Sequence, residues 1–600
     1  MTSSPDVVDE PPPAFASMWR LCKLGYSHEP GLLVFAFVMS LLAAVPDALL
    51  ALWLQFLANG ALDDNRVLVL IAVSGLALSV TLTWLMRVVT SRVTRRFRDK
   101  VTVALESHVA HLQASVSTIE HHERQDFLDR LSILRNQVFV LDHMYLSLFS
   151  TCGWIVRLGI TLGLLMSIHP ALALLAFFAA PTVVTSSWRP GVERAVEERS
   201  ASHQRLAAHL FTTATTASAG KEVRVTGIGP RLVRRRREEW EKWYVDVTAA
   251  RWASALWHAL AWGVFGAGFV GAVVFVASGL QASAGQVLLL LAAGSRLSAY
   301  VAATMSEIGF MRGIWLDGSR RLAWLEDYAA ALTEQADQPA PDTLLRGIRL
   351  EGVSFSYPST DTVVLDEVTL DLPAGTVVAI VGENGAGKST LVKLLCKMYQ
   401  PTSGQIWVDG QPLSAIQTAA WRAKVSGAFQ DFYRFEFTAR TSVGLGDLSA
   451  LDDDAAVRRA VGKAGANDIV EQLRSGLDTQ LGPIWPNGVD VSFGQWQKLA
   501  LARGFMRGDP LLLVLDEPTA ALDAETEHAL FSRYAEAARR GTRGGITVLV
   551  SHRFSTVRMA DLIVVLQGAK LAQVGTHDAL MRTGGTYAEL YSIQAAAYSR

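Results

Sequence analysis

The sequence predicts a membrane-embedded bundle of six α-helices followed by an α/β domain that carries a phosphate-binding loop. Six long apolar stretches lie in the first half of the 600-residue chain, and the second half alternates short apolar runs with helical segments. Charged residues make up 18% of the sequence and hydrophobic residues 50%, whereas soluble domains average about 25% charged residues. These observations indicate a membrane domain joined to a soluble one.

Each apolar stretch is long enough, or nearly so, to cross a bilayer, which takes about 20 residues. So many runs of this length would be very unusual as buried helices of a soluble domain. The fourth stretch is the shortest, and Pro181 interrupts it. The predicted spans are Gly31–Leu57, Val67–Val89, Phe139–Met166, Ala171–Ser187, Trp252–Ala277 and Val287–Ile308.

The Lys and Arg residues between the spans predict their orientation. The two long links, Thr90–Val138 and Trp188–Arg251, are rich in Arg, whereas Arg66 is the only Lys or Arg in the three short links. Cytoplasmic loops carry the excess of Lys and Arg. We therefore predict a multi-pass protein of the inner (cytoplasmic) membrane, with both long links, both termini and the α/β domain in the cytoplasm.

A glycine-rich loop stands between an apolar strand and a helix in “VVAIVGENGAGKSTLVKLL”, where Gly382 to Ser389 fit G-x-x-x-x-G-K-[ST]. Such a loop closes backbone N–H groups around phosphate oxygens at a helix N-terminus. Lys388 would reach the β- and γ-phosphates of a nucleotide, and Ser389 would bind Mg²⁺. The predicted nucleotide-binding residues of this loop are Gly382, Glu383, Asn384, Gly385, Ala386, Gly387, Lys388, Ser389 and Thr390.

Two further apolar strands end in groups suited to phosphate hydrolysis. The stretch “LLLVLDEP” ends in Asp516, which can hold Mg²⁺, and Glu517, which can orient or deprotonate the attacking water. The stretch “TVLVSHR” ends in His552, which we predict contacts the γ-phosphate. The predicted catalytic residues are therefore Lys388, Glu517 and His552, with ATP and Mg²⁺ as the cofactors.

These patterns divide the chain into four segments. We predict a tail and interfacial helix at 1–30, a transmembrane domain at 31–326, a linker at 327–347 and a nucleotide-binding domain at 348–600. The linker reads “DYAAALTEQADQPAPDTLLRG”, and its Pro, Gln and Asp content suits a connection. The net charge of −1 gives no drive toward nucleic acid, so we expect no nucleic-acid partner.

With these motifs the chain resembles a half-size ATP-binding cassette (ABC) transporter with the exporter-type fold. The resemblance covers nearly the whole chain and includes “VDVSFGQWQKLALAR” at residues 489–503. In that family, two nucleotide-binding domains enclose two ATP molecules head to tail. The resemblance implies that Ser492, Gly494 and Gln495 cover the ATP held by a partner subunit.

The resemblance also assigns roles to residues outside the phosphate loop. Tyr357 matches the aromatic residue that stacks on adenine, and Gln430 matches the glutamine that contacts Mg²⁺ and couples to the membrane domain, which adds Gln430 to the predicted catalytic residues. Asp523 matches the loop that links the two ATP sites. The segments Ile119–Leu131 and Ser218–Leu232 look like the cytoplasmic loops that dock on the nucleotide-binding domains.

One position of the signature helix departs from the family's usual Leu-Ser-Gly-Gly-Gln. Phe493 stands where the family has a glycine, which permits close backbone approach and any φ. The N–H donors survive if φ is negative and the ring points outward. A homodimer would place Phe493 in both shared sites, whereas a heterodimer with a second half-transporter could confine it to one, and both assemblies stay open.

The resemblance implies an ATP hydrolase coupled to export of a small molecule, peptide or lipid. Import through the same fold and an ATP-gated sensor or channel are the alternatives, although an intact Glu517 and His552 argue against the latter. The sequence does not identify the substrate, but Asp47 is a candidate contact for a cationic group of the substrate. Polar residues within the predicted spans are Asp47, Gln55, Arg157, His258, Arg296 and Glu307.

Overall fold

The computed structural model describes residues 12–598 except 217–218, 281, 312–315, 359, 361, 518–542 and 552. It divides into two compact units. The first contains residues up to 113 and 132–328, and the second contains 114–131 and 329–600. The linear boundaries predicted above did not anticipate that a segment between two membrane helices belongs to the second unit.

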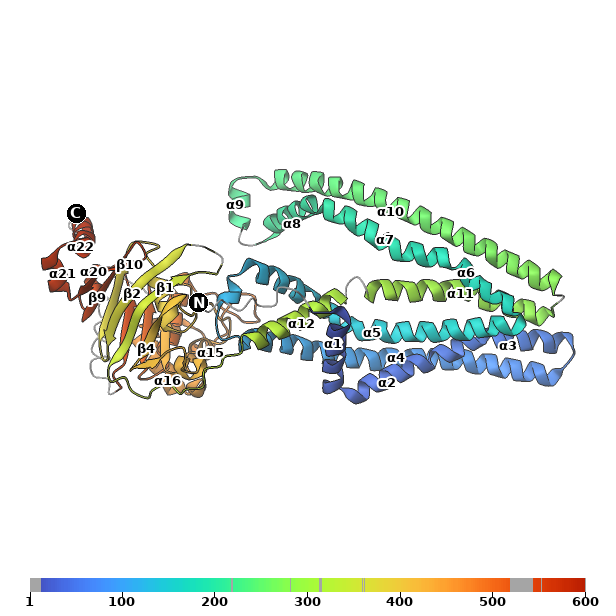
Figure 1. The fold of residues 1–600 in the computed structure, drawn as a ribbon, viewed down its shortest axis with the longest axis horizontal. Helices are drawn as coiled ribbons and strands as arrows, with labels where there is room; N and C mark the ends of the chain where they lie inside the picture. Colours follow the sequence, from blue (N-terminus) through green and yellow to red (C-terminus); the bar gives the residue numbers. More distant parts are fainter. Residues whose placement is uncertain are drawn as a thin grey trace. The chain divides into compact units, whose positions relative to one another are not determined.

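The first unit is entirely helical in its described residues (Figure 1). Three of its helices, α4, α5 and α12, continue into the second unit. The helices are α1 (Ala14–His28), α2 (Pro30–Leu42), α3 (Ala44–Leu62), α4 (Arg66–Ser115), α5 (Gln125–Ile168), α6 (Leu174–Phe178), α7 (Ala180–Arg199), α8 (Ala201–Thr215), α9 (Gly220–Val225), α10 (Gly229–Val274), α11 (Ala284–Phe310) and α12 (Leu316–Ala331).

Within the described residues, six helical stretches are long and apolar enough to cross a membrane, which confirms the predicted bundle. Helices α4 and α10 contain 50 and 46 residues, so each is roughly 70 Å long at 1.5 Å per residue. A bilayer core is about 30 Å thick, so these helices extend well beyond it. The six stretches are Pro30–Leu62, Arg66–Ser115, His143–Ile168, Pro170–Glu197, Gly229–Gly279 and Ala284–Gly309.

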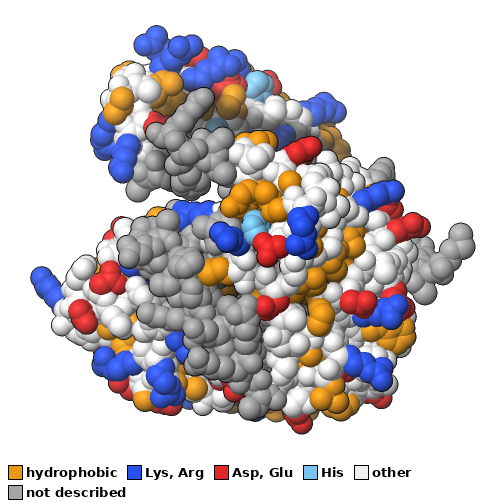
Figure 2. Space-filling view, turned by 90° about the vertical axis from the view of Figure 1, so that its left-hand side faces the viewer, with side chains coloured by type: hydrophobic (Ala, Val, Ile, Leu, Met, Phe, Trp, Pro, Cys, Tyr) orange, Lys and Arg blue, Asp and Glu red, His pale blue; other side chains and the backbone are white. Residues whose placement is uncertain are grey.

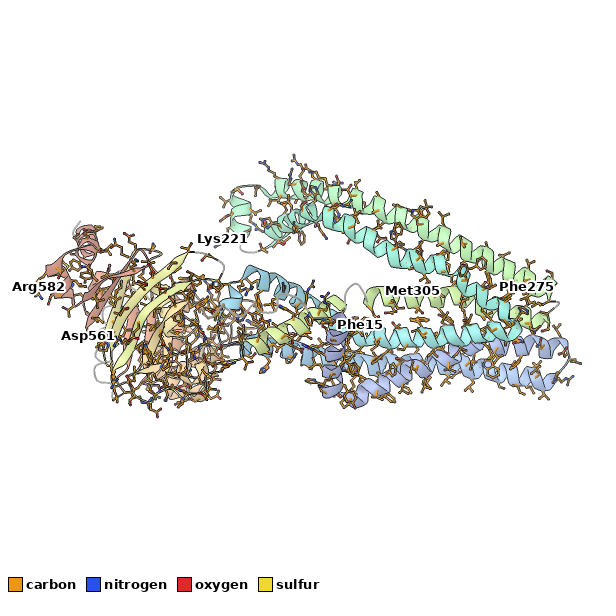
Figure 3. All side chains as sticks on the ribbon, in the orientation of Figure 1. Phe15, Lys221, Phe275, Met305, Asp561 and Arg582 are labelled. Atoms are coloured by element: carbon orange, nitrogen blue, oxygen red, sulfur yellow. The ribbon has the colours of Figure 1, made fainter. Side chains whose placement is uncertain are left out.

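Helices α7, α8 and α10 form an arm of the first unit, in which α10 packs along both α7 and α8. The arm separates from α3, α5 and α11 toward the α9 turn (Figure 1). Lys221 lies in that turn and Phe275 at the opposite end of the arm (Figure 3). Lys and Arg side chains gather on the lobe at the top of Figure 2. The cytoplasmic position of the link Trp188–Arg251 stays a prediction.

The second unit contains two sheets. The first is antiparallel with the strand order β2-β1-β4-β5, and the second has the order β10-β9-β3-β8-β7-β6 and is parallel except for β10. The strands are β1 (Gly347–Ser356), β2 (Val363–Pro373), β3 (Val377–Gly382), β4 (Ser403–Val408), β5 (Gln411–Pro412), β6 (Val425–Ala428), β7 (Leu512–Asp516), β8 (Ile546–Val550), β9 (Leu562–Gln567) and β10 (Lys570–Gly575).

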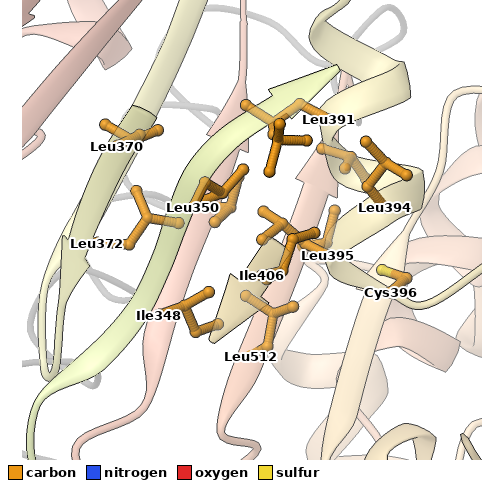
Figure 4. Close-up of a cluster of buried hydrophobic side chains, with 14 of the residues drawn as sticks. Ile348, Leu350, Leu370, Leu372, Leu391, Leu394, Leu395, Cys396, Ile406 and Leu512 are labelled. Atoms are coloured by element: carbon orange, nitrogen blue, oxygen red, sulfur yellow. The ribbon is translucent and has the colours of Figure 1, made fainter. Parts of the chain in front are cut away.

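One apolar core joins both sheets to helix α13 (Lys388–Leu395). Leu391, Leu394 and Leu395 of α13 pack with Leu350 of β1 and Leu512 of β7 (Figure 4). Strands β3, β7 and β8 are buried along their whole length, which is typical of parallel strands covered on both faces. The carboxyl ends of β3 and β7 therefore lie at one edge of the sheet, beside the N-terminus of α13.

A smaller helical part of this unit has a core of its own. Trp496 and Leu499 of the signature helix are buried in that core, so one face of the helix is fixed by packing while its N-terminus is exposed. Besides α13, the described α-helices that begin after β1 in the second unit, in both parts, are α14 (Thr418–Arg422), α15 (Ala439–Gly444), α16 (Asp454–Lys463), α17 (Asn467–Gln472), α18 (Phe493–Gly504), α20 (Phe554–Val557), α21 (His577–Thr583) and α22 (Thr586–Tyr598).

Candidate nucleotide site

The glycine-rich loop leaves the end of β3 and enters α13. Its glycines at 382, 385 and 387 have φ of +156°, +82° and +94°. A Cβ on Gly387 would lie 2.7 Å from both the Val364 carbonyl oxygen and Leu365 Cδ2. Only glycine fits there, because the left-handed backbone and the close neighbours both exclude a side chain. The glycines therefore fix the backbone conformation of the loop at the N-terminus of α13.

Lys388 closes this loop from the inside. Its buried ammonium donates to the carbonyl oxygens of Gly382 and Glu383, both at 2.9 Å. Burial lowers the pKa of Lys388, and the nearby Glu517 and Asp516 raise it in opposition. The side chain thus places a positive charge at the loop, where a phosphate would add to the negative charge of the two carboxylates.

Asp516 and Glu517 stand at the end of β7. Asp516 is 5% exposed and accepts a hydrogen bond of 3.3 Å from the Ser389 hydroxyl. Burial, more than the neighbouring Glu517 and Asp431, raises the pKa of Asp516. Glu517 has φ of +45°, and its N–H donates to the Val550 carbonyl at 3.1 Å. A buried carboxylate beside a hydroxyl is a chemical fit for Mg²⁺, a cation that takes oxygen ligands and keeps several waters.

Tyr357 follows β1 and is half-buried. Its hydroxyl lies 3.0 Å from the Thr390 hydroxyl, and the Lys393 ammonium lies 5.3 Å from its ring. Gln430 is exposed beyond β6, next to Asp431, whose charge reaches Asp516. The structure therefore brings the segments of Tyr357 and Gln430 to the edge that carries the phosphate loop. Their roles at a nucleotide stay predictions, and Asp523 and His552 lie outside the described residues.

The signature helix α18 begins at Phe493. Ser492 and Gln495 form a reciprocal capping box at its N-terminus, and Gly494 lies between them. Phe493 is absent from the residues with positive φ in the described chain, so no glycine is required there. Its ring is 56% exposed, packs 5.5 Å from the Phe432 ring and lies under the Arg434 guanidinium. The ring therefore packs beside Phe432, and Ser492 at the N-terminus of the helix stays exposed.

We expect Phe493→Gly to leave Mg·ATP hydrolysis within about threefold of wild type. The substitution places glycine in the first helical turn at a cost of about 0.5–1 kcal/mol and removes the contact with Phe432, so a lower melting temperature should accompany it. The melting temperature of Phe493→Ala should lie between those of wild type and Phe493→Gly. A tenfold gain in hydrolysis by the glycine variant would show instead that the ring obstructs the shared site.

The segment 114–131, which runs from the end of α4 to the start of α5, packs against the rest of the second unit (the nucleotide unit, 329–600). The Ile119 N–H donates to the Met398 carbonyl at 3.1 Å, and Ile119 packs against the core of the two sheets. Arg422 donates to the Ser117 carbonyl at 2.7 Å. The Lys393 ammonium, already over Tyr357, pairs with Glu123 at 3.3 Å. The segment predicted to dock therefore does so next to the predicted adenine contact.

The sequence did not identify the residues that contact this segment from the nucleotide unit. These residues are Lys393, Met398 and Arg422, which follow the phosphate loop at positions with no distinguishing motif. Only the structure identifies them, through their contacts with Glu123, Ile119 and Ser117. The other predicted docking segment, Ser218–Leu232, forms the α9 turn of the arm in the first unit. Its docking stays a prediction, and part of it lies outside the described residues.

His121, in the short turn η1 (Glu120–His122), gives this docking a predicted pH dependence. It is 2% exposed, and burial together with His122 lowers its pKa from 6.5 to about 4, against an opposing hydrogen bond to the Thr118 backbone. Because the unfolded state takes up the proton at a higher pH than the folded state does, His121 does not lower the free energy of unfolding above about pH 6.5. The free energy of unfolding then falls as the pH drops from about 6.5 toward 4. We expect the melting temperature to fall between pH 7 and pH 5, and less so in His121→Phe.

The fold and the site define a class of protein: a half-transporter in which a six-span domain is fused to a nucleotide-binding domain. Residues 365–520 match the family model described as ABC transporter. This match covers part of the second unit, and the chain as a whole has the exporter-type fold.

Comparisons with known proteins agree with this assignment. The nisin transport ATP-binding protein NisT of Lactococcus lactis subsp. lactis is 26% identical over 587 residues, which cover 95% of this chain and 94% of that protein. An ATP-dependent lipid A-core flippase of Ralstonia nicotianae is 39% identical over 249 residues, which cover 41% of this chain and 40% of that one. A bacterial Atm1-family ABC exporter with ATP bound has a TM-score of 0.72 at 24% identity and is matched over 95% of this chain and 99% of its own.

Proposed function

We propose that the chain is one half of a dimeric exporter that uses ATP hydrolysis to move a small molecule, peptide or lipid out across the cytoplasmic membrane. The observation that carries the proposal is the placement of 114–131, which joins two membrane-spanning helices yet packs as part of the nucleotide unit. A change at the nucleotide site can thus reach α4 and α5 directly. Similarity to a nisin transport protein and a lipid A-core flippase supports a peptide or lipid substrate.

Bound Mg·ATP supplies the phosphoanhydride bond whose hydrolysis drives the cycle. Lys388 would neutralise the β- and γ-phosphates, and Ser389 and Asp516 would hold Mg²⁺ with Gln430. Glu517 would orient and deprotonate water at the end of β7, and we assign a γ-phosphate contact to His552. This division of roles is what phosphoryl transfer needs, because positioning and charge stabilisation supply most of the catalysis.

The second half of each ATP site comes from the partner subunit in this proposal. Ser492, Gly494 and Gln495 present the open N-terminus of α18, and a helix N-terminus favours a phosphate. Asp523 would link the two sites. The negative φ of Phe493 removes an objection to a homodimer, so we propose that a homodimer is competent and that a heterodimer with a second half-transporter is not required.

Inside-out membrane vesicles test the direction and the energy source of transport. The nucleotide domains then face the bath, so an exporter accumulates its substrate in the lumen when ATP is added. We would follow fluorescently labelled nisin and labelled lipid A, with ATP or a non-hydrolysable analogue. Accumulation of either probe with ATP alone supports the proposal. ATP-driven loss from preloaded vesicles would indicate import, and equilibration with either nucleotide would indicate a channel.

We expect Ile119→Asp to uncouple the two units. A carboxylate placed against the apolar core of the nucleotide unit must be desolvated or must move away, and either outcome breaks the docking. Probe accumulation per ATP hydrolysed should fall at least tenfold, while basal hydrolysis stays within about threefold. Ile119→Leu is the matched control, since it keeps an apolar side chain of the same volume. Unchanged accumulation in Ile119→Asp would contradict the proposed route.

A further inference from the structure

Four polar side chains of the transmembrane unit meet about halfway along their membrane spans. Asp47 lies in the span Pro30–Leu62, Arg157 in His143–Ile168, and Arg296 with Tyr300 in Ala284–Gly309. Each of the three charged residues stands near the middle of its span. Charged groups at this depth are costly, and they face a protein interior or a water-filled cavity.

Asp47 is fully engaged in this cluster. Its carboxylate accepts from Arg157 Nε at 3.1 Å, from the Tyr300 hydroxyl at 3.0 Å and from Arg296 Nη1 at 3.3 Å. Trp154 adds an apolar wall, because its ring lies 5.7 Å from the Tyr300 ring and under the Arg157 guanidinium at 4.5 Å. The pairing argues against the expectation that Asp47 binds a cationic group of the substrate.

The boundary between α2 and α3 lies at the same level. Helix α2 ends at Leu42 and α3 begins at Ala44, while Ala43 between them keeps a helical backbone and donates its N–H to the Met39 carbonyl. The two arginines donate to carbonyl oxygens near this boundary, Arg157 to that of Ala43 at 3.5 Å and Arg296 to that of Asp47 at 2.8 Å. These bonds tie both arginines to the first span.

The cluster carries one surplus positive charge, because it contains two guanidinium groups and one carboxylate. Arg296 is the more accessible of the two, with 41% of its side chain exposed against 18% for Arg157. Within the described part of the transmembrane unit, both hydrogen bonds from Arg296 to Asp47 use Nη1, and the Tyr300 hydroxyl is a further polar neighbour of the guanidinium. An exposed guanidinium at membrane depth can form charge-assisted hydrogen bonds to an anionic ligand.

We propose that this cluster, formed by Asp47, Arg157, Arg296 and Tyr300, is a substrate subsite that takes the carboxylate or phosphate of an amphipathic molecule. The inference rests on the proposed transport function and names the charge class of its substrate. Arg296, the more exposed arginine, binds the anion, Asp47 and Tyr300 hold Arg296 in place, and Trp154 packs against the apolar part of the ligand.

Three dansyl probes that differ in charge test the proposal: dansylglycine (anionic), dansylamide (neutral) and dansylethylenediamine (cationic). Binding to the full chain in zwitterionic lipid nanodiscs is followed by dansyl fluorescence without nucleotide, so it does not depend on hydrolysis. We expect dansylglycine to bind tightest and to lose about tenfold in affinity in Arg296→Gln, with dansylamide unchanged. Arg296→Lys should keep the preference because the charge remains. Arg87→Gln, which removes a guanidinium stacked on Trp84, is the matched control.

Equal binding of the three probes to the wild-type chain would overturn the proposal. An equal loss for all three in Arg296→Gln would also overturn it, because that result indicates a structural arginine. Asp47→Asn gives a second test: it should preserve or strengthen dansylglycine binding, and a specific loss of the cationic probe would instead return Asp47 to a cation-binding role. Nanodiscs that contain phosphatidylglycerol separate the sources of the anion. If phosphatidylglycerol competes with dansylglycine, the natural anion is a lipid phosphate. If it does not compete, the natural anion belongs to a soluble amphiphile. Both results support an anion subsite.

Discussion

Glu517→Gln is expected to lower Mg·ATP hydrolysis by the chain, purified alone in lipid, roughly a hundredfold to ten-thousandfold. The backbone of Glu517 has φ of +45° and is held by a hydrogen bond to Val550. The side chain therefore starts from a fixed position at the end of β7, beside the phosphate loop. Glutamine keeps the size and loses the base. ATP binding should persist, since no phosphate contact is assigned to Glu517.

Steady-state phosphate release measures this effect. Glu471→Gln on α17, an exposed carboxylate of the same unit, is the matched control and should behave as wild type. Hydrolysis by wild type alone would also establish a competent homodimer. A wild-type chain that is folded and binds ATP but does not hydrolyse it would point to an obligatory partner. Activity of Glu517→Gln equal to wild type would contradict the catalytic role.

Lys388→Met is expected to weaken ATP binding roughly a hundredfold. The ammonium makes two 2.9 Å hydrogen bonds that span the phosphate loop, and each charge-assisted bond contributes about 1.5–3 kcal/mol. Methionine removes these bonds and the positive charge that would face the phosphates. Equilibrium titration with a fluorescent ATP analogue gives the dissociation constant directly.

Lys424→Met separates this effect from a general loss of charge. Lys424 pairs with Asp342, which is itself largely exposed, and exposed pairs contribute about 0–1 kcal/mol. Its ATP affinity should therefore match wild type. A Lys388→Met variant that folds and binds ATP within threefold of wild type would show that the lysine only supports the loop.

The sequence predicted the parts of the site that are local along the chain. Gly382 to Ser389 lie in one continuous strand, loop and helix, so the residue types alone specify the turn at the N-terminus of α13. The same holds for Asp516 and Glu517, because a buried strand delivers both to a sheet edge. The six spans were predicted for a similar reason. Polar groups are costly inside a bilayer, so a membrane span appears in the sequence as a continuous apolar stretch.

Only the tertiary structure determined which distant residues meet. Arg422 reaches Ser117, 305 positions earlier in the chain, and Arg296 reaches Asp47 across 249 positions. It also decided the orientation of Phe493, which depends on the backbone at the start of α18 and on Phe432. A sequence pattern reports what each segment prefers over a few residues. Contacts of this kind arise from the packing of whole helices and sheets, so no local pattern specifies them.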